Sequence, residues 1–362
     1  MKIGIITFHT VYNFGAVLQA YGLQEYLCSI GHDAYIIDYC PEYLKERYKT
    51  FSLKRILSNN GAARIKFFIR EFLTYPILKS RERFFRDFLN NFLRLESFEG
   101  LDEYNDYDAF VFGSDQIWNP LICNGLDPMF FGEFAAANGK RLISYAGSMG
   151  SLKHFSDEQK HLFLKKIAPF YAISSREKEP AEFIAKGLNR PVVTVVDPVL
   201  LAGREIFEKI ATKNLTEKPY LLLFTLGNNE RTFNIAHKIA KEKKLKVVEI
   251  VSFQVSLKKG SVIQALSVPD FLGYIYAANF VVTSSFHGTA LSVLFGKELY
   301  YVPDDSKTGE RATNLLQMLG IGDRVWSSDY GNDESPIEYN SVFSTLDVER
   351  RKSADFIKSA LG

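Results

Sequence analysis

Cysteine is scarce in this 362-residue chain, and Cys28, Cys40 and Cys123 are its three examples. They are widely separated and form no C-x-x-C pair, so they support neither a disulfide framework nor a zinc cluster. The sequence also lacks an apolar run close to the roughly 20 residues that cross a bilayer. Its first apolar run lacks the length and the cleavage site of a signal peptide. We therefore expect a cytoplasmic protein with no metal site and no membrane span.

A strong net charge is missing too, since 44 basic and 42 acidic residues leave a formal charge of +2. This balance argues against a nucleic-acid binder. The exception is the segment 44–96, which holds 13 Lys or Arg and 5 Asp or Glu. The structural interpretation of its aromatic, helical pattern is a helical hairpin, inserted at about 43–98, that packs on the first lobe. The alternative is a surface for a lipid-linked substrate at the inner face of the membrane, with Arg81, Arg83 and Arg86 as candidate lipid contacts.

The remaining pattern is an alternation of short apolar runs with stretches of helical length, which predicts parallel sheets. We expect two Rossmann-like α/β lobes with a cleft between them. The predicted limits are 1–203 for the N-terminal lobe, 204–345 for the C-terminal lobe, and 346–362 for a terminal helix that packs back on the first lobe.

Several catalytic templates are absent from the sequence. It contains no G-x-G-x-x-G, no G-x-S-x-G, no H-E-x-x-H and no G-x-x-x-x-G-K-[ST]. These absences argue against a dinucleotide fingerprint, a serine hydrolase elbow, a zinc protease and a P-loop.

Polar residues at predicted strand ends are the candidates for a site, because ligands of parallel α/β sheets bind there. Asn13 and Gly15 suit a tight turn whose free backbone N–H groups could hold an anion. Arg176 follows a predicted strand and either binds an anion or forms a surface ion pair with a neighbouring glutamate. Arg311 either points into the cleft or is solvated. His287 lies at a strand-to-helix turn, where a structural role and proton transfer are about equally supported.

Seven stretches, taken in order, resemble the polysaccharide pyruvyl transferase family. They are YNFGAVLQAYGLQ near the start, VFGSDQIW (111–118), SYAGSMG (144–150), SSRE (174–177), VVDPVLL (195–201), TSSFHG (283–288) and ERATNLL (310–316). The resemblance implies a fold like that of the GT-B glycosyltransferases. It also implies transfer of a pyruvyl group from phosphoenolpyruvate to a sugar of a surface polysaccharide, or to its lipid-linked precursor, as a ketal. Phosphoenolpyruvate is then the donor substrate, and no further cofactor is expected.

By this resemblance, His287 matches the catalytic histidine of the family and Arg176 matches an arginine that binds the donor. The other substrate-binding candidates come from the same loops: Asn13, Gly15, Asp115, Gln116, Ser284, Ser285, Gly288 and Arg311. Two other functions stay open, a glycosyltransferase that uses a nucleotide-sugar and a glycan-binding protein without catalysis.

One position departs from the family pattern, which has an arginine two residues before the histidine. This sequence has Ser285 there. A hydroxyl supplies neither the charge nor the forked donors of a guanidinium. Either another cation, such as Arg311 or Lys307, replaces it, or the donor differs, or the activity is lost.

Overall fold

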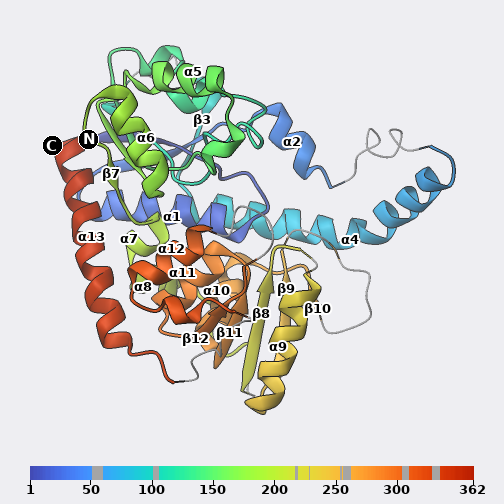
Figure 1. Ribbon diagram of the computed structural model, residues 1–362. Coiled ribbons are helices and arrows are strands. Elements are labelled where there is room, and N and C mark those ends of the chain that lie inside the picture. The colour runs from blue at the N-terminus through green and yellow to red at the C-terminus, as the bar shows by residue number, and fades with distance from the viewer. Residues whose placement is uncertain are drawn as a thin grey trace.

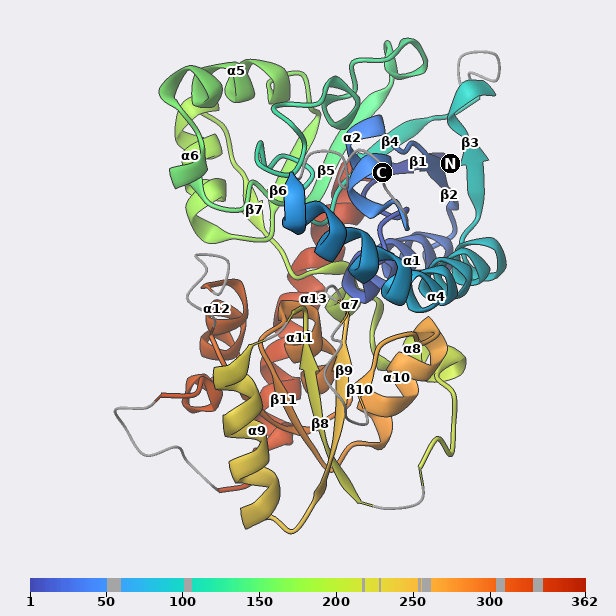
Figure 2. The same ribbon diagram turned by 90° about the vertical axis from the view of Figure 1, so that its right-hand side faces the viewer.

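The computed structural model describes residues 1–50, 60–100, 106–216, 219–227, 229–252, 255, 262–303, 310–327 and 335–362. Two parallel sheets form two lobes, which lie one above the other in Figure 2, and each sheet is flanked by helices. The predicted two-lobed α/β architecture is confirmed. No helix of the described residues combines the length and the apolar character needed to cross a membrane.

The sheet of the first lobe has seven strands in the order β3-β2-β1-β4-β5-β6-β7. They are β1 (Lys2–Ile6), β2 (Asp33–Asp38), β3 (Leu95–Ser97), β4 (Ala109–Phe112), β5 (Arg141–Gly147), β6 (Ala172–Ser175) and β7 (Val193–Thr194). Ile5 of β1 pairs in register with Ile36 on one side and Val111 on the other. The strand order reverses between β1 and β4, and such a switch point is where doubly wound sheets bind ligands.

The sheet of the second lobe has the order β10-β9-β8-β11-β12. Its strands are β8 (Tyr220–Thr225), β9 (Lys246–Val251), β10 (Val262–Ile263), β11 (Phe280–Thr283) and β12 (Glu298–Tyr301). Its order reverses between β8 and β11, so the turn that carries His287, directly after β11, lies at the switch point of this lobe.

Twelve α-helices connect and cover these strands in the described part of the chain. They are α1 (Phe14–Ser29), α2 (Glu42–Tyr48), α4 (Gly61–Phe92), α5 (Asp157–Ile167), α6 (Lys178–Leu188), α7 (Pro198–Ala202), α8 (Arg204–Ile210), α9 (Glu230–Glu242), α10 (Val268–Ala277), α11 (Phe286–Leu294), α12 (Glu310–Met318) and α13 (Tyr339–Leu361). Helix α13 runs along both lobes (Figure 1), and near its end the carbonyls of Ala360 and Leu361 accept hydrogen bonds from Arg141 of β5. The predicted lobe limits stay a prediction.

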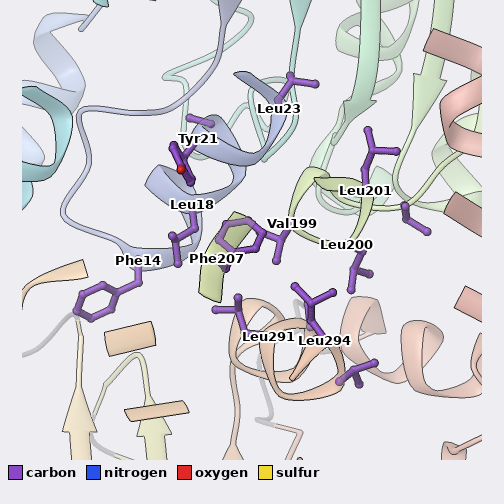
Figure 3. Close-up of a cluster of buried hydrophobic side chains, with 14 of the residues drawn as sticks. Phe14, Leu18, Tyr21, Leu23, Val199, Leu200, Leu201, Phe207, Leu291 and Leu294 are labelled. Atoms are coloured by element: carbon purple, nitrogen blue, oxygen red, sulfur yellow. The ribbon is translucent and has the colours of Figure 1, made fainter. Parts of the chain in front are cut away.

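One apolar core joins the two lobes. Helix α1 of the first lobe is buried on nearly all sides, and its Leu18 lies with Val199 of α7 and Leu291 of α11 in a single cluster (Figure 3). Phe14 of α1 stacks on Phe271 of α10 with ring centroids 4.1 Å apart. Because burial of apolar surface is the main stabilising contribution to folding, this shared core holds the lobes in contact.

The segment predicted as a helical insertion is helical, with α2 and α4 on either side of residues 51–59, which lie outside the described part of the chain. Phe68, Phe72, Phe85 and Phe88 all lie on the single 32-residue helix α4, which contains Pro76. Phe85 and Phe88 are buried, as expected of aromatic residues that pack on the lobe, whereas Phe68 and Phe72 are exposed. The prediction also missed β3, which lies within 43–98 and extends the edge of the sheet. Three half-exposed residues give too short a pattern to detect a strand.

Arg81 was wrongly predicted as a lipid contact. Its side chain is buried, and it donates hydrogen bonds to the backbone carbonyls of Val251 and Gln264 in the second lobe. Burial lowers the pKa of this guanidinium to about 10. Arg81 therefore attaches α4 to the second lobe, while Arg83 and Arg86 stay exposed.

Candidate functional site

Helix caps fix the conformation of two turns, one from each lobe, that face each other. The side chain of Asn13 accepts a hydrogen bond from the N–H of Gly15 and so caps α1, which follows the turn after β1. Ser285 caps α11 in the same way, with its Oγ 3.4 Å from the amide nitrogen of Gly288. Asn and Ser are favoured at these positions because their oxygen satisfies an N–H group that the first helical turn leaves unpaired. His287 follows in the first turn of α11.

Asp197 joins several parts of the site. Its Oδ1 accepts the N–H of Val199 at 2.9 Å and so caps α7, while Pro198 occupies the first helical position. Its Oδ2 accepts hydrogen bonds from Arg176 Nη1 at 2.6 Å and from Ser114 Oγ at 3.2 Å. A carboxylate with this many donors is stabilised in its charged form.

His287 belongs to the second lobe but lies against the first. Its Nε2 is 3.6 Å from Asp197 Oδ2, which is an ion-pair distance for a protonated imidazole. A Cβ added at Gly15 would lie 2.0 Å from Nδ1 of His287, so the ring occupies the space that only a glycine leaves open. Burial by itself would raise the pKa of Asp197, but His287 and Arg176 together hold it well below its usual range. The carboxylate is therefore charged at neutral pH.

Arg176 is the cation at the centre of the site, with a side chain only 4% exposed. Besides its bond to Asp197, its Nε is 3.5 Å from Glu177 Oε1 and its Nη2 is 4.0 Å from Asp115 Oδ1. Burial would lower the pKa of this guanidinium, but the carboxylates of Glu177 and Asp197 raise it. Within the described residues Nη2 is buried and has no hydrogen-bond acceptor.

Arg311 of α12 is a second cation beside the first. The guanidinium carbons of Arg176 and Arg311 lie 4.8 Å and 5.7 Å from the centroid of the Phe286 ring. Burial, and then the positive charge of Arg176, lower the pKa of Arg311. In the ranges that the structure describes, no hydrogen bond or ion pair neutralises Arg311. Two guanidinium groups that share one ring repel each other, and a bound anion would relieve the repulsion.

Two cavities flank these residues. The first, here the α12 cavity, has a volume of about 670 Å³ and is lined by Arg176, Asp197, Phe286 and Arg311 among others. Lys178 and Lys352 add further cations to its wall. The second, here the α2 cavity, has a volume of about 370 Å³. Asn13, Arg47, Tyr48, Asp115 and Gln116 lie in its wall, together with Leu226 and Gly227 of the second lobe.

The two cavities share no lining residue, and an ion pair joins their walls. Asp115 lines the α2 cavity, Arg176 and Asp197 line the α12 cavity, and Asp115 and Arg176 are in ion-pair contact. His287 is not among the residues that line either cavity, because its ring is buried between Asp197 and Gly15.

Other predicted residues have local roles in the structure. Gln116 Oε1 accepts a hydrogen bond from Asn119, and Ser284 is half-buried at the end of β11. A Cβ at Gly288 would lie 2.5 Å from Thr283 Oγ1, so this glycine permits close packing of α11 on the sheet. Lys307, named as a replacement cation, lies outside the described residues.

Asp197, Phe286 and Arg47 are the residues that sequence reasoning missed. Asp197 carried a signal, since an acidic residue before proline at the end of a strand is typical of a helix cap at a ligand-binding edge. Phe286 and Arg47 carried none, because their positions depend on how α11 and α2 pack.

Comparison with solved structures finds remote similarity over nearly the whole chain. The S. aureus MnaA-UDP co-structure is 11% identical with a TM-score of 0.49 and covers 96% of this chain and 87% of its own. Anabaena Alr3699/HepE in complex with UDP and glucose is 9% identical with a TM-score of 0.49 and covers 99% of this chain and 100% of its own. Similarity this low transfers neither a ligand nor an activity.

The sequence comparisons differ in outcome. The comparison with curated proteins finds no match. The family model described as "Polysaccharide pyruvyl transferase" matches residues 13–306, which include Asp115, Arg176, Glu177, Asp197 and His287 of the ion-pair network, while Arg311 lies beyond the matched range. The chain therefore belongs to the polysaccharide pyruvyl transferase family.

Proposed function

We propose that this protein transfers the pyruvyl group of phosphoenolpyruvate to two hydroxyls of one sugar, in a surface polysaccharide or its lipid-linked precursor. The observation that carries the proposal is the pair Arg176 and Arg311 in the wall of the α12 cavity. Among the described residues, Nη2 of Arg176 is a buried donor without an acceptor. Burial and the positive charge of Arg176 lower the pKa of Arg311. The carboxylate and phosphate of phosphoenolpyruvate would satisfy both guanidinium groups.

The structure supports one of the alternatives raised for Ser285, replacement of the family arginine by another cation. Its backbone lies at the N-cap of α11 and its hydroxyl faces the Gly288 N–H, so the residue at this position organises the turn. Arg311 lies beside Phe286, the next residue along the chain. We infer that Arg311 supplies from α12 the positive charge that the family pattern supplies from the position of Ser285.

His287 and Asp197 fit the proton transfers of ketal formation. In the first step a protonated His287 gives its proton to the methylene carbon of phosphoenolpyruvate, and a sugar hydroxyl adds to the neighbouring carbon. The imidazole then takes the proton of that hydroxyl. In the second step the proton leaves with phosphate, a second hydroxyl closes the ketal, and its proton returns to the ring. The Asp197 carboxylate stabilises the imidazolium each time it forms.

The geometry places one requirement on this mechanism. Asp197 lies between the His287 ring and the α12 cavity, and its Oδ2 is held by Arg176. Direct proton transfer therefore requires the donor anion to draw Arg176 away from Asp197. The sugar would occupy the α2 cavity, where Asn13, Asp115 and Gln116 offer hydrogen-bond partners to its hydroxyls.

Acceptor-dependent phosphate release tests the proposal. The protein is incubated with phosphoenolpyruvate and a panel of sugars, nucleotide-sugars and lipid-linked glycans, and phosphate is measured. We expect release with at least one acceptor and its loss, by roughly 100-fold or more, in His287→Ala. Tight binding of a nucleotide-sugar, with no release of phosphate from phosphoenolpyruvate in the presence of any acceptor, would instead identify a glycosyltransferase and overturn the proposal.

A further inference from the structure

The N-terminal half of α4 exposes apolar side chains far from both cavities. Figure 1 shows this half extending beyond the two lobes. Its exposed apolar residues are Ile65, Phe68, Ile69, Phe72, Leu73 and Tyr75, and Phe72 is 70% exposed and Ile65 64% exposed. Single exposed apolar residues are normal on a protein surface, but a contiguous group marks a contact surface.

These residues lie on one face of the helix. Ile65, Phe68, Ile69 and Phe72 follow the i, i+3, i+4, i+7 spacing that lines one side of an α-helix. Glu71 and Thr74, which lie on the opposite side, are buried. This half of α4 therefore presents a row of large apolar side chains to the surroundings, while two polar side chains of its opposite side are buried.

Basic residues border the exposed face. Arg64, Lys66 and Arg70 are exposed, and residues 61–70 contain no Asp or Glu. Glu71, the acid nearest to them along the helix, is buried. The face therefore combines apolar contact area with the exposed cations Lys66 and Arg70, the composition of helices that lie in the interface of an anionic membrane.

We propose that the Ile65, Phe68, Ile69 and Phe72 face of α4 docks the protein on an anionic lipid surface. The helix would lie in the plane of the headgroups with these side chains inserted, while Lys66 and Arg70 contact lipid phosphates. Charge argues against a second copy as the occupant. Two such faces in contact would bring Lys66 and Arg70 of both copies together, and these like charges would repel each other.

The α2 cavity lies beside the C-terminal half of the same helix. Thr50, just beyond α2, donates a hydrogen bond to Glu82 of α4 at 2.7 Å, and the ring of Tyr12 contacts both Phe85 of α4 and Tyr48 of the cavity wall. The cavity thus lies beside the helix that docks. A lipid-linked acceptor could then reach Arg47 with its diphosphate while its lipid stays in the bilayer, a step that rests on the proposed function.

Vesicle binding without substrates tests the docking separately from the reaction. The full chain is sedimented with vesicles of phosphatidylcholine alone or of phosphatidylcholine with phosphatidylglycerol. We expect binding to the anionic vesicles and a decrease on the order of tenfold or more in the double variant Phe68→Ser and Phe72→Ser. Lys66→Glu with Arg70→Glu should lose binding to the anionic vesicles as well.

The matched control removes exposed apolar residues elsewhere. Leu121→Ser with Val348→Ser, at positions 67% and 52% exposed, should bind vesicles like the unchanged protein. Circular dichroism and the midpoint of thermal unfolding show that each variant is folded. The proposal is overturned if the protein ignores anionic vesicles, if both apolar pairs have equal effects, or if the α4 variants abolish a dimer seen by light scattering and leave vesicle binding intact.

Discussion

Replacement of Arg311 by Gln should weaken phosphoenolpyruvate binding without weakening the fold. The folded protein disfavours the charge of Arg311, because burial and Arg176 both lower its pKa. The substitution removes this repulsion and keeps a polar, although shorter, side chain at a half-buried position. The midpoint of thermal unfolding should therefore stay constant or rise.

The loss of affinity can be estimated from the contact that Arg311 would make. A hydrogen bond to a charged group contributes about 1.5–3 kcal/mol. At about 1.4 kcal/mol for each factor of ten, the dissociation constant of phosphoenolpyruvate should increase roughly 10- to 150-fold. The turnover number at saturating donor should change less, since Arg311 is assigned to binding.

Calorimetric titration with phosphoenolpyruvate measures this change, and Lys241→Gln is the matched control because Lys241 is an exposed cation on α9. An affinity in Arg311→Gln within twofold of the control would remove Arg311 from the donor site. A lowered unfolding midpoint would instead show that Arg311 stabilises the fold, contrary to the direction of its pKa shift.

Three further substitutions test the network and the lobe contact. Gly15→Ala should reduce phosphate release about as much as His287→Ala while donor binding by calorimetry persists, because the added methyl would displace the imidazole. Asp197→Asn should lower the free energy of unfolding in urea by about 3–5 kcal/mol at pH 7, since it leaves a buried cation without its partner. Because its pKa is lowered in the folded protein, Asp197 stabilises the fold fully above about pH 4 and less as the pH falls further. The difference in the free energy of unfolding between the unchanged protein and Asp197→Asn should therefore shrink in acid, and a constant difference would contradict this. Arg81→Met should lower the same free energy by about 1–3 kcal/mol per carbonyl left unpaired, and Arg83→Met, at an exposed position, should not.

Much of the fold follows from local patterns in the sequence. The runs that became β1, β4, β8 and β11 are apolar along their length because strands of a parallel sheet are buried on both faces. The segment around α4 could not be predicted equally well. Both halves of the helix carry phenylalanines at helical spacing, and the difference between buried Phe85 and exposed Phe72 arises only where the helix leaves the body of the protein.

The candidate site shows the same division between local and long-range information. His287, Arg176 and Gly15 were candidates because they follow predicted strands, and the roles expected of His287 and Arg176 came from the family resemblance. The bond between Arg176 and Asp197 joins residues 21 positions apart, and the contact between Gly15 and His287 joins the two lobes. Spacing along the chain carries no signal for such pairs, and it also hides that the two guanidinium groups share the ring of Phe286.

The apolar core shared by the lobes limits how substrates can enter. Opening the lobes would separate Phe14 from Phe271 and expose Leu18 and Leu291, so a wide hinge motion would resemble partial unfolding. Under the proposed function, donor and acceptor would occupy the α12 and α2 cavities, which share no lining residue, so they could bind in either order. Steady-state kinetics should then show a sequential mechanism with random addition. A change in the packing of the shared core, far from any substrate, should also alter turnover because it shifts His287 relative to Asp197.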